Sequence, residues 1–254
     1  MSKITAAQTR GSRPYQEDFF IAERVKFAEK ECVILAVIDG HRGDGVARFC
    51  QEKLLSFLEN AFLNFKGDFE KALRRTVKKL HNGTRKEYVG STLSIACIPE
   101  NQERVFIAIL GDSPVIVIDI DGNLHISPEH NVRTNMNERE RAIKRGALYS
   151  DGYIWMLGDE VGLQLSRALG NRDMETILDR NPEIYSLPLG GKSAVLVASD
   201  GFIDPRYYNQ TTVAELKRSA IVSAKNDGLD AAELLEQAEK QGFENNATVL
   251  LWTP

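Results

Sequence analysis

The chain has 254 residues, 43% of them hydrophobic, and a formal net charge of −4. This length and composition can form a core without stabilising disulfides, and no Pro/Gly/Ser-rich linker divides the chain, so we expect one domain over residues 1–254. Acidic and basic residues are interspersed, which argues against nucleic-acid or membrane partners; we expect a monomer.

The cysteine count and the N-terminal segment indicate the compartment. There are three cysteines, an odd number, and the first residues lack the apolar run of a secretory signal. No later stretch reaches the apolar length of a membrane span. We therefore expect a cytoplasmic protein with reduced thiols.

The first third of the chain predicts two strands followed by two helices. Residues 17–24 and 32–38 are compact apolar runs, and the second is almost continuous, as in a strand covered on both faces. From Asp44 apolar residues recur at helical spacing as far as Phe62. A second helix is predicted after Asp68, whose side chain can cap it.

The rest of the chain predicts more strands and then a second pair of helices. Four short strands, interpreted as an antiparallel meander, are expected at 90–98, 104–110, 114–120 and 123–127. A helical segment around 136–145 precedes a strand at 193–199, helices starting at Thr212 and Asp230, and a last strand in ATVLLW. This order predicts the α+β class: a four-layer αββα sandwich, with a central antiparallel β-sandwich flanked by helix pairs.

Acidic residues stand at or beside the ends of several predicted strands. They are Glu17, Asp18, Asp39, Asp112 and Asp200. Carboxylates presented from several strand ends suit hard cations such as Mg²⁺ or Mn²⁺, which prefer oxygen ligands. The pattern indicates metal-assisted phosphate chemistry.

Turn formation is the alternative explanation for some of these aspartates. Asp121-Gly122 lies between two predicted strands and is interpreted as a hairpin turn. Asp39-Gly40 and Asp200-Gly201 instead lead toward helical patterns. The pattern alone therefore leaves two explanations for these aspartates, a metal site and ordinary turns.

Other phosphate-handling mechanisms fit the residues poorly. No cysteine is followed by an arginine at the spacing that a thiolate-based phosphatase needs, and no P-loop sequence occurs. His125 and His130 could form a small metal site, but solvated hairpin positions explain them more simply.

Seven short segments, in order, carry a family resemblance. They are R-P-Y-Q-E-D at 13–18, V-I-D-G-H-R-G at 37–43, G-S-T-L at 90–93, G-D-S-P at 111–114, S-R-A-L-G-N at 166–171, S-D-G-F-I-D at 199–204 and N-N-A-T-V at 245–249. Together they resemble the metal-dependent protein Ser/Thr phosphatases of type 2C. The resemblance extends over essentially the whole chain.

The resemblance implies a centre with two Mn²⁺ or Mg²⁺ ions bridged by Asp39. The carbonyl of Gly40 and the side chain of Glu17 would serve one ion, and Asp200 and Asn245 the other. Asp18 would orient metal-bound water. Asp112 and Asp204 match residues that in many members hold a third, weaker ion.

The same resemblance implies the reaction. The ions would lower the pKa of a bridging water, so that hydroxide attacks the phosphorus of phosphoserine or phosphothreonine in a protein substrate without a phosphoenzyme. His41 matches the general acid that protonates the leaving group. Arg13 matches a phosphate-binding arginine, although an ion pair with Glu17 is the alternative.

The chain departs from the family pattern at a metal ligand. Asn245 stands where active members normally have an aspartate, and an amide oxygen brings no charge to the cation. Asn171, Pro114 and Arg42 are further departures, at positions not expected to hold metal. Two hypotheses therefore remain: an active phosphatase with one weakened metal position, and a pseudophosphatase that binds or regulates without hydrolysis.

Overall fold

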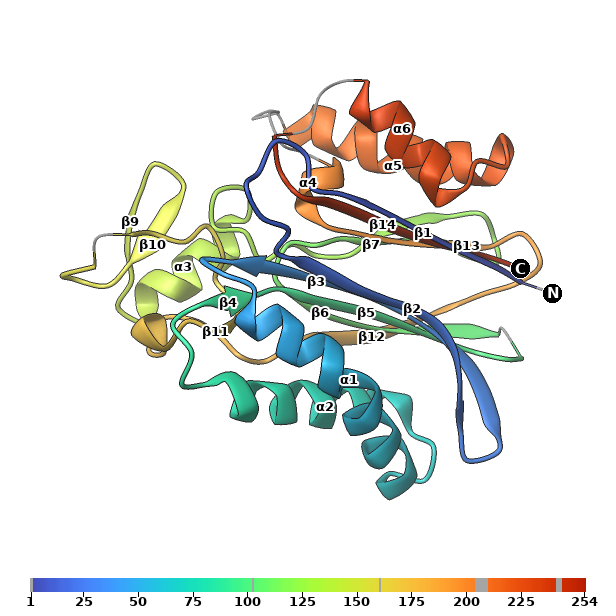
Figure 1. Ribbon diagram of the computed structural model, residues 1–254, viewed down its shortest axis with the longest axis horizontal. Helices are drawn as coiled ribbons and strands as arrows, with labels where there is room; N and C mark the ends of the chain where they lie inside the picture. The colour runs from blue at the N-terminus through green and yellow to red at the C-terminus, as the bar shows by residue number, and fades with distance from the viewer. Residues whose placement is uncertain (1, 102, 160, 204–209, 241–243) are drawn as a thin grey trace.

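The computed structural model describes residues 2–101, 103–159, 161–203, 210–240 and 244–254, with only the backbone described at 210–214. Two antiparallel sheets face each other, and a helix pair covers the outer side of each (Figure 1). The predicted α+β architecture, with sheets between helix layers, is confirmed.

The first sheet is built around the long strand β3 (Lys30–His41). β3 pairs with β2 (Asp18–Phe27) on one side and with β5 (Leu93–Pro99) on the other. The sheet continues with β6 (Arg104–Leu110) and β12 (Glu183–Pro188), and the short strands β4 (Gly90–Ser91) and β11 (Leu169–Gly170) extend its other end. β12 was not predicted from the sequence.

Helices α1 (Gly45–Asn64) and α2 (Phe69–Thr84) cover the outer face of this sheet. Leu54 and Leu58 of α1 and Leu73 of α2 are fully buried against apolar strand residues such as Ile34. Asp68 caps α2 by accepting a hydrogen bond from the Lys71 amide at 3.0 Å, which confirms the predicted start of the helix.

The second sheet joins the two ends of the chain. Its order is β1 (Lys3–Thr9), β14 (Ala247–Thr253), β13 (Ala194–Ala198), β7 (Val115–Ile118) and β8 (Leu124–Ile126). α5 (Gln210–Asn226) and α6 (Ala231–Glu239) cover it (Figure 1), and Asp230 starts α6 with the expected capping box. The predicted start signal at Thr212 is inside α5, where only the backbone is described.

The predicted meander is wrong in one respect, and the difference creates a seam between the sheets. β5 and β6 pair in the first sheet, whereas β7 and β8 form a hairpin in the second. The chain changes sheets between Gly111, whose φ is +122°, and Pro114. A positive φ suits glycine, and proline cannot donate to a sheet hydrogen bond, so both residues favour a break in the strand. Asp112 is therefore held at the seam.

A smaller unit completes the molecule. It contains α3 (Met136–Lys144), the hairpin of β9 (Leu148–Ser150) and β10 (Tyr153–Trp155), and the 3₁₀ turn η1 (Arg172–Met174). Ile154 and Met174 are fully buried in its own apolar cluster. In the part of the chain that the structure describes, no helix is both long enough and apolar enough to cross a bilayer.

Candidate active site

Two aspartates face each other at the end of the β2–β3 hairpin. Asp18 and Asp39 are direct partners in the antiparallel register. Like charges directly opposite each other destabilise a sheet, so this placement needs a reason other than strand stability. Asp18 is buried and accepts a hydrogen bond from the Thr248 hydroxyl at 2.7 Å. That contact ties the first sheet to the second.

A third carboxylate reaches the pair from the second sheet. Asp200 begins the single-turn helix α4 (Asp200–Ile203) directly after β13, and its side chain is hydrogen-bonded to Asp39. Asn245 lies beside it and donates its amide N–H to Oδ1 of Asp200 at 3.1 Å. The oxygen of the Asn245 side chain accepts from the Asn246 amide at 3.0 Å.

Asp112 adds a fourth carboxylate from the seam between the sheets. Its Oδ2 accepts a hydrogen bond from the Asn131 side chain at 2.8 Å, and its charge is felt by both Asp39 and Asp200. Asp18, Asp39, Asp112 and Asp200 are together called the carboxylate cluster below.

The pKa values in the carboxylate cluster show how crowded it is. Burial raises the pKa of Asp39 well above its usual value, and the charges of Asp18, Asp200 and Asp112 raise it further. Burial also raises the pKa of Asp200 to about 8 and that of Asp112 to about 6. No described Lys or Arg forms an ion pair with Asp18, Asp39 or Asp200. Removing these carboxylates from water without a cation partner is unfavourable.

The chemistry of this cluster fits divalent cations. Its donors are all oxygens, and a dication would offset the repulsion among them. Among the described residues, no three Asp, Glu, His or Cys side chains are already arranged around one point as metal ligands; Asp39 instead hydrogen-bonds to Asp18 and Asp200. Asp204, the other predicted ligand of a third ion, is outside the described residues.

Glu17 and Gly40 are held together at the same edge. The Gly40 amide donates to the Glu17 carbonyl at 3.1 Å, and a Cβ on Gly40 would lie only 2.6 Å from that oxygen. Asn246 fixes the preceding segment, because its side-chain oxygen accepts from the Glu17 amide at 2.8 Å and its nitrogen donates to the carbonyls of Arg10 and Tyr15. This role of Asn246 was not predicted from the sequence.

His41 ends β3 beside the carboxylate cluster. Its Nε2 donates to the side-chain oxygen of Asn171 at 2.9 Å, and burial lowers the pKa of His41 to about 4. Gly90 leaves room for this pair, since a Cβ there would lie 2.0 Å from Oδ1 of Asn171 and 2.3 Å from Nε2 of His41. Only the folded structure identifies Asn171 as the partner of His41.

Arg13 and Arg42, which lie close to predicted site residues in the sequence, differ in their contacts. Arg13 is exposed and makes no ion pair with Glu17, so the alternative explanation for it does not hold. Arg42 is tied down: it pairs with Asp173 at 2.6 Å and donates to the Val161 carbonyl at 2.9 Å.

Comparison with known protein families identifies the family to which this chain belongs. The family model described as "Protein phosphatase 2C" matches residues 3–247, almost the whole chain. The chain belongs to the protein phosphatase 2C family.

Relatives in this family include plant phosphatases. "Probable protein phosphatase 2C 76" of Arabidopsis thaliana is 28% identical over 249 residues, which are 95% of this chain and 56% of the relative. "Probable protein phosphatase 2C 52" of Oryza sativa subsp. japonica is 26% identical over 250 residues, 95% of this chain and 48% of the relative. The chain thus spans about half the length of these relatives.

Solved structures of phosphatases share the fold. A phosphatase from a pathogenic strain of Toxoplasma gondii superposes with a TM-score of 0.78 at 19% identity, covering 99% of this chain and 92% of that one. The catalytic domain of the serine threonine phosphatase PstP, solved in complex with two manganese ions, gives a TM-score of 0.59 at 17% identity, covering 99% of this chain and 97% of that one. At these identities the likeness supports the fold alone.

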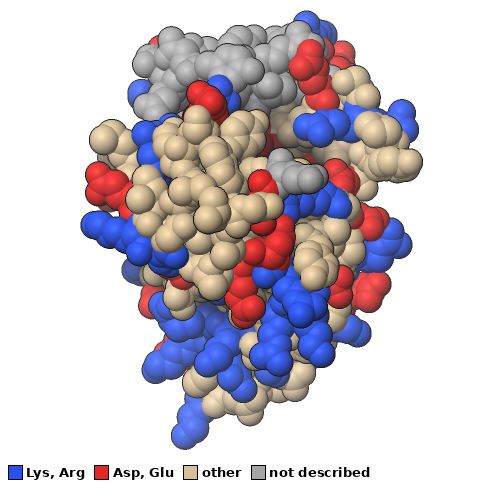
Figure 2. Space-filling model, turned by 90° about the vertical axis from the view of Figure 1, so that its left-hand side faces the viewer, with Lys and Arg blue, Asp and Glu red and all other residues tan. Residues whose placement is uncertain are grey.

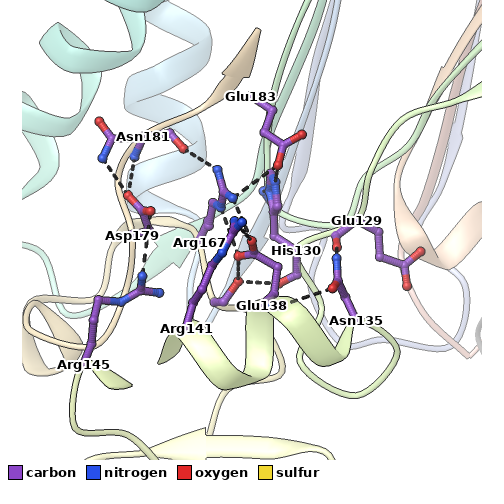
Figure 3. Close-up of polar contacts among 12 residues, drawn as sticks. Glu129, His130, Asn135, Glu138, Arg141, Arg145, Arg167, Asp179, Asn181 and Glu183 are labelled. Atoms are coloured by element: carbon purple, nitrogen blue, oxygen red, sulfur yellow. Dashed lines mark hydrogen bonds and ion pairs between the residues drawn. The ribbon is translucent and has the colours of Figure 1, made fainter. Parts of the chain in front are cut away.

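In a second group of charges, acidic and basic side chains pair with one another (Figure 3). The carboxylate of Glu138 in α3 accepts two hydrogen bonds from Arg167, one from Nε at 3.0 Å and one from Nη2 at 2.7 Å. Arg167 also pairs with Glu183 at 3.2 Å. Arg141 pairs with Glu138 at 2.8 Å. We call Glu138, Arg141, Arg167, Glu183 and the adjacent His130 the ion-pair network. Arg167 belongs to the S-R-A-L-G-N segment of the 2C resemblance, and its role here is structural.

His130 corrects an expectation from the sequence. It is fully buried rather than solvated, and its Nδ1 accepts from the Gly111 amide at 3.0 Å, next to Asp112. His125 instead pairs with Asp119 at 2.6 Å. The two histidines have different partners, and they do not form a metal site with each other.

Proposed function

We propose that this member of the 2C family hydrolyses phosphoserine and phosphothreonine in proteins with two bound Mn²⁺ or Mg²⁺ ions. One observation carries the proposal: carboxylates from separate strand ends, Asp18, Asp39 and Asp200, are in contact with one another, and no Lys or Arg in the described part of the chain forms an ion pair with them. Burial without charge compensation is tolerated where a ligand supplies the charge.

Each ion would be held by oxygen atoms of several of the residues predicted from the sequence. Asp39 would bridge the two, with Glu17 and the Gly40 carbonyl on one side and Asp200 and Asn245 on the other. Asp112 and Asp204 would hold a weaker third. When bound, the ions would act as Lewis acids on the phosphoryl group and supply hydroxide at neutral pH.

The remaining residues would bind the substrate and move protons. Asp18 would orient the attacking water. Arg13, exposed and unpaired with Glu17, would bind phosphate oxygens through its planar guanidinium. His41 would protonate the departing Ser or Thr oxygen. Burial lowers the pKa of His41 to about 4, and a bound phosphoryl dianion would raise it again, since an opposite charge favours the imidazolium.

Mn²⁺-dependent turnover tests the proposal. We expect hydrolysis of p-nitrophenyl phosphate and of a phosphothreonine peptide that a chelator abolishes and added Mn²⁺ restores. Absence of turnover at millimolar Mn²⁺, with Mn²⁺ binding still detected by calorimetry, would reject the enzyme in favour of a binding protein.

Asn245 is the observation that favours the second candidate, a pseudophosphatase. Its amide nitrogen faces Asp200 and its oxygen is occupied by the Asn246 amide, so it adds no charge for a second ion. At about 4 Å and an effective dielectric near 20, a unit charge pair is worth roughly 4 kcal/mol. We therefore expect Asn245→Asp to tighten Mn²⁺ binding at least about tenfold by calorimetry. An unchanged affinity would show that residue 245 is not a ligand.

Three further features complete the proposal. Cys32, Cys50 and Cys97 are all buried free thiols, which supports a reducing compartment such as the cytoplasm. We also propose that the chain acts as one catalytic domain and as a monomer, because its first strand β1 pairs with its last strand β14. Light scattering of the purified chain tests the oligomeric state.

A further inference from the structure

The solvent-facing side of α2 is strongly basic. From Lys71 to Lys86 the chain has seven Lys or Arg residues and no Asp or Glu, although the net charge of the whole chain is −4. Six of them are exposed: Lys71, Arg74, Arg75, Lys78, Arg85 and Lys86. Four of them lie on α2 and two directly follow it; we call the six residues together the basic face of α2.

Most of these charges are unpaired. Lys71 pairs with Asp68 at 2.8 Å, but no described acidic residue forms an ion pair with the other five. The seventh residue, Lys79, is half-buried with its ammonium 5.2 Å from the Phe57 ring centroid. Clustered like charges on one helix repel one another, and a polyanionic partner would relieve that repulsion.

The basic face leads to the candidate active site. After α2 the chain passes through Tyr88, which is 61% exposed and has the Arg172 guanidinium 5.7 Å from its ring centroid. Two residues later Gly90 pairs with His41 in the sheet. Figure 2 views the left-hand end of Figure 1, where α2 ends, and shows Lys and Arg side chains gathered over its lower part.

The geometry points to an acidic segment of the phosphoprotein substrate as the occupant of this surface: we propose that the basic face of α2 docks an acidic tract that lies apart from the phosphorylated residue in the substrate chain. This inference rests on the proposed function and adds a substrate class to it. The 16 residues of α2 extend about 24 Å, which an extended tract of about seven residues would match.

An anionic membrane is the less favoured occupant. Helices that bind bilayers insert an apolar face, but the apolar side of α2, including Leu73, Val77 and Leu80, is fully buried in the core. None of the exposed side chains of α2 is a large apolar one. The surface offers charge without an inserting face, which suits an acidic polypeptide.

Two matched variants test the docking surface. The first is Arg74→Gln/Arg75→Gln/Lys78→Gln. The control is Lys192→Gln/Arg218→Gln/Lys225→Gln, with Lys192 in the turn between β12 and β13 and the other two residues on α5, which covers the second sheet. Both remove three positive charges, and glutamine keeps the helices favourable. None of the six residues belongs to the proposed catalytic machinery, so p-nitrophenyl phosphate turnover should stay unchanged in both.

The substrates are phosphothreonine peptides in which a Gly/Ser spacer separates the phosphothreonine from a six-residue tract of Glu or of Gln. Each tract is placed on the N-terminal side of the phosphothreonine in one peptide and on its C-terminal side in another. We expect the wild-type KM for the better Glu peptide to be about fivefold below that for its Gln counterpart, with the advantage lost at 0.5 M NaCl. The α2 variant should lose the advantage, and the control should keep it. Equal KM values for Glu and Gln peptides, or equal losses in both variants, would overturn the proposal.

A binding measurement separates this inference from the proposed function. Fluorescence anisotropy with an unphosphorylated, labelled Glu-tract peptide reads docking even if the chain hydrolyses nothing. We expect weaker binding to the α2 variant alone. If phosphatidylserine vesicles bind the wild type more tightly than the peptide does, and that binding is lost in the same variant, the surface is a membrane site and the proposal fails.

Discussion

The carboxylate cluster and the ion-pair network are neighbouring groups of charged side chains, most of them buried or half-buried, with opposite balance. In the network, Glu138 has Arg167 and Arg141 within ion-pair distance, at 2.7 and 2.8 Å. In the cluster, Asp39 has carboxylates for neighbours and is hydrogen-bonded to two of them. Paired charges offset one another's cost of burial, whereas unpaired ones reduce the stability of the fold and attract a ligand of the opposite sign. Burial of an acidic residue alone therefore does not mark a site; the absence of a counter-charge among the described residues around it does.

Removing the central carboxylate should have the largest effect. We expect Asp39→Asn to lower kcat/KM for p-nitrophenyl phosphate at least about 10³-fold, equivalent to about 4 kcal/mol of barrier. The free energy of unfolding in chelator should rise by about 1 kcal/mol, since Asp18 then faces a neutral partner. Enzyme assays and urea titrations measure the two effects.

The exposed hairpin variant Asp121→Asn is the control, and it should change neither quantity. If Asp39→Asn kept more than a tenth of wild-type activity, Asp39 could not be the bridging residue.

Neutralising the corresponding carboxylate of the network should act on stability instead. Glu138→Gln would leave the buried Arg167 without its bidentate partner, and we expect a loss of about 3 kcal/mol of unfolding free energy in urea titrations. Glu140→Gln, an exposed position on the same helix, should stay within about 0.5 kcal/mol of wild type. Equal stability of the two variants would mean that the pairing of Glu138 with Arg167 does not stabilise the fold.

Acid should weaken the network as well. Burial alone would raise the pKa of Glu138, but hydrogen bonds from Arg167 and Ser166 lower it to about 2, and the charges of Arg167 and His130 act in the same direction. Arg141 also contacts it. Because the unfolded state takes up the proton first, this stabilisation is complete above the ordinary pKa of about 4.5 and is lost progressively as pH falls toward 2.

Between pH 5 and pH 3 the wild type should therefore lose roughly 2 kcal/mol more unfolding free energy than Glu138→Gln. Urea titrations at the two pH values check this. Parallel losses in both proteins would place the acid sensitivity elsewhere.

The smallest expected effect concerns the position of His41. A methyl group in Gly90→Ala would press against both His41 and Asn171, so we expect kcat to fall about tenfold with little change in KM. Gly191→Ala is the matched control, since a Cβ there meets nothing within 4 Å. An unchanged kcat in Gly90→Ala would mean that the His41–Asn171 contact does not support turnover.

Local sequence signals predicted much of the fold. The cap at Asp68, the apolar period of α1, the hairpin turn at Asp121-Gly122 and the capping box at Asp230 all act over a few residues, and each appears in the structure. β1 and β12 were not predicted. Every residue of β12 is half-buried, the residues of β1 are half-buried or exposed, and neither strand has a strong apolar pattern. The sequence also did not predict which sheet β7 joins, because strands pair with partners that are distant in the chain.

For the candidate site, the sequence by itself determined the kinds of side chain and their order: acidic residues at strand ends, a histidine at the end of β3, and an asparagine at position 245. Only the tertiary structure decided their partners, as with Thr248 for Asp18, Asn171 for His41 and Arg167 for Glu138. These partners are 230, 130 and 29 residues apart in the chain. Whether a buried charge is neutralised depends on which distant segment packs against it, and sheet pairing and core packing settle that when the chain folds.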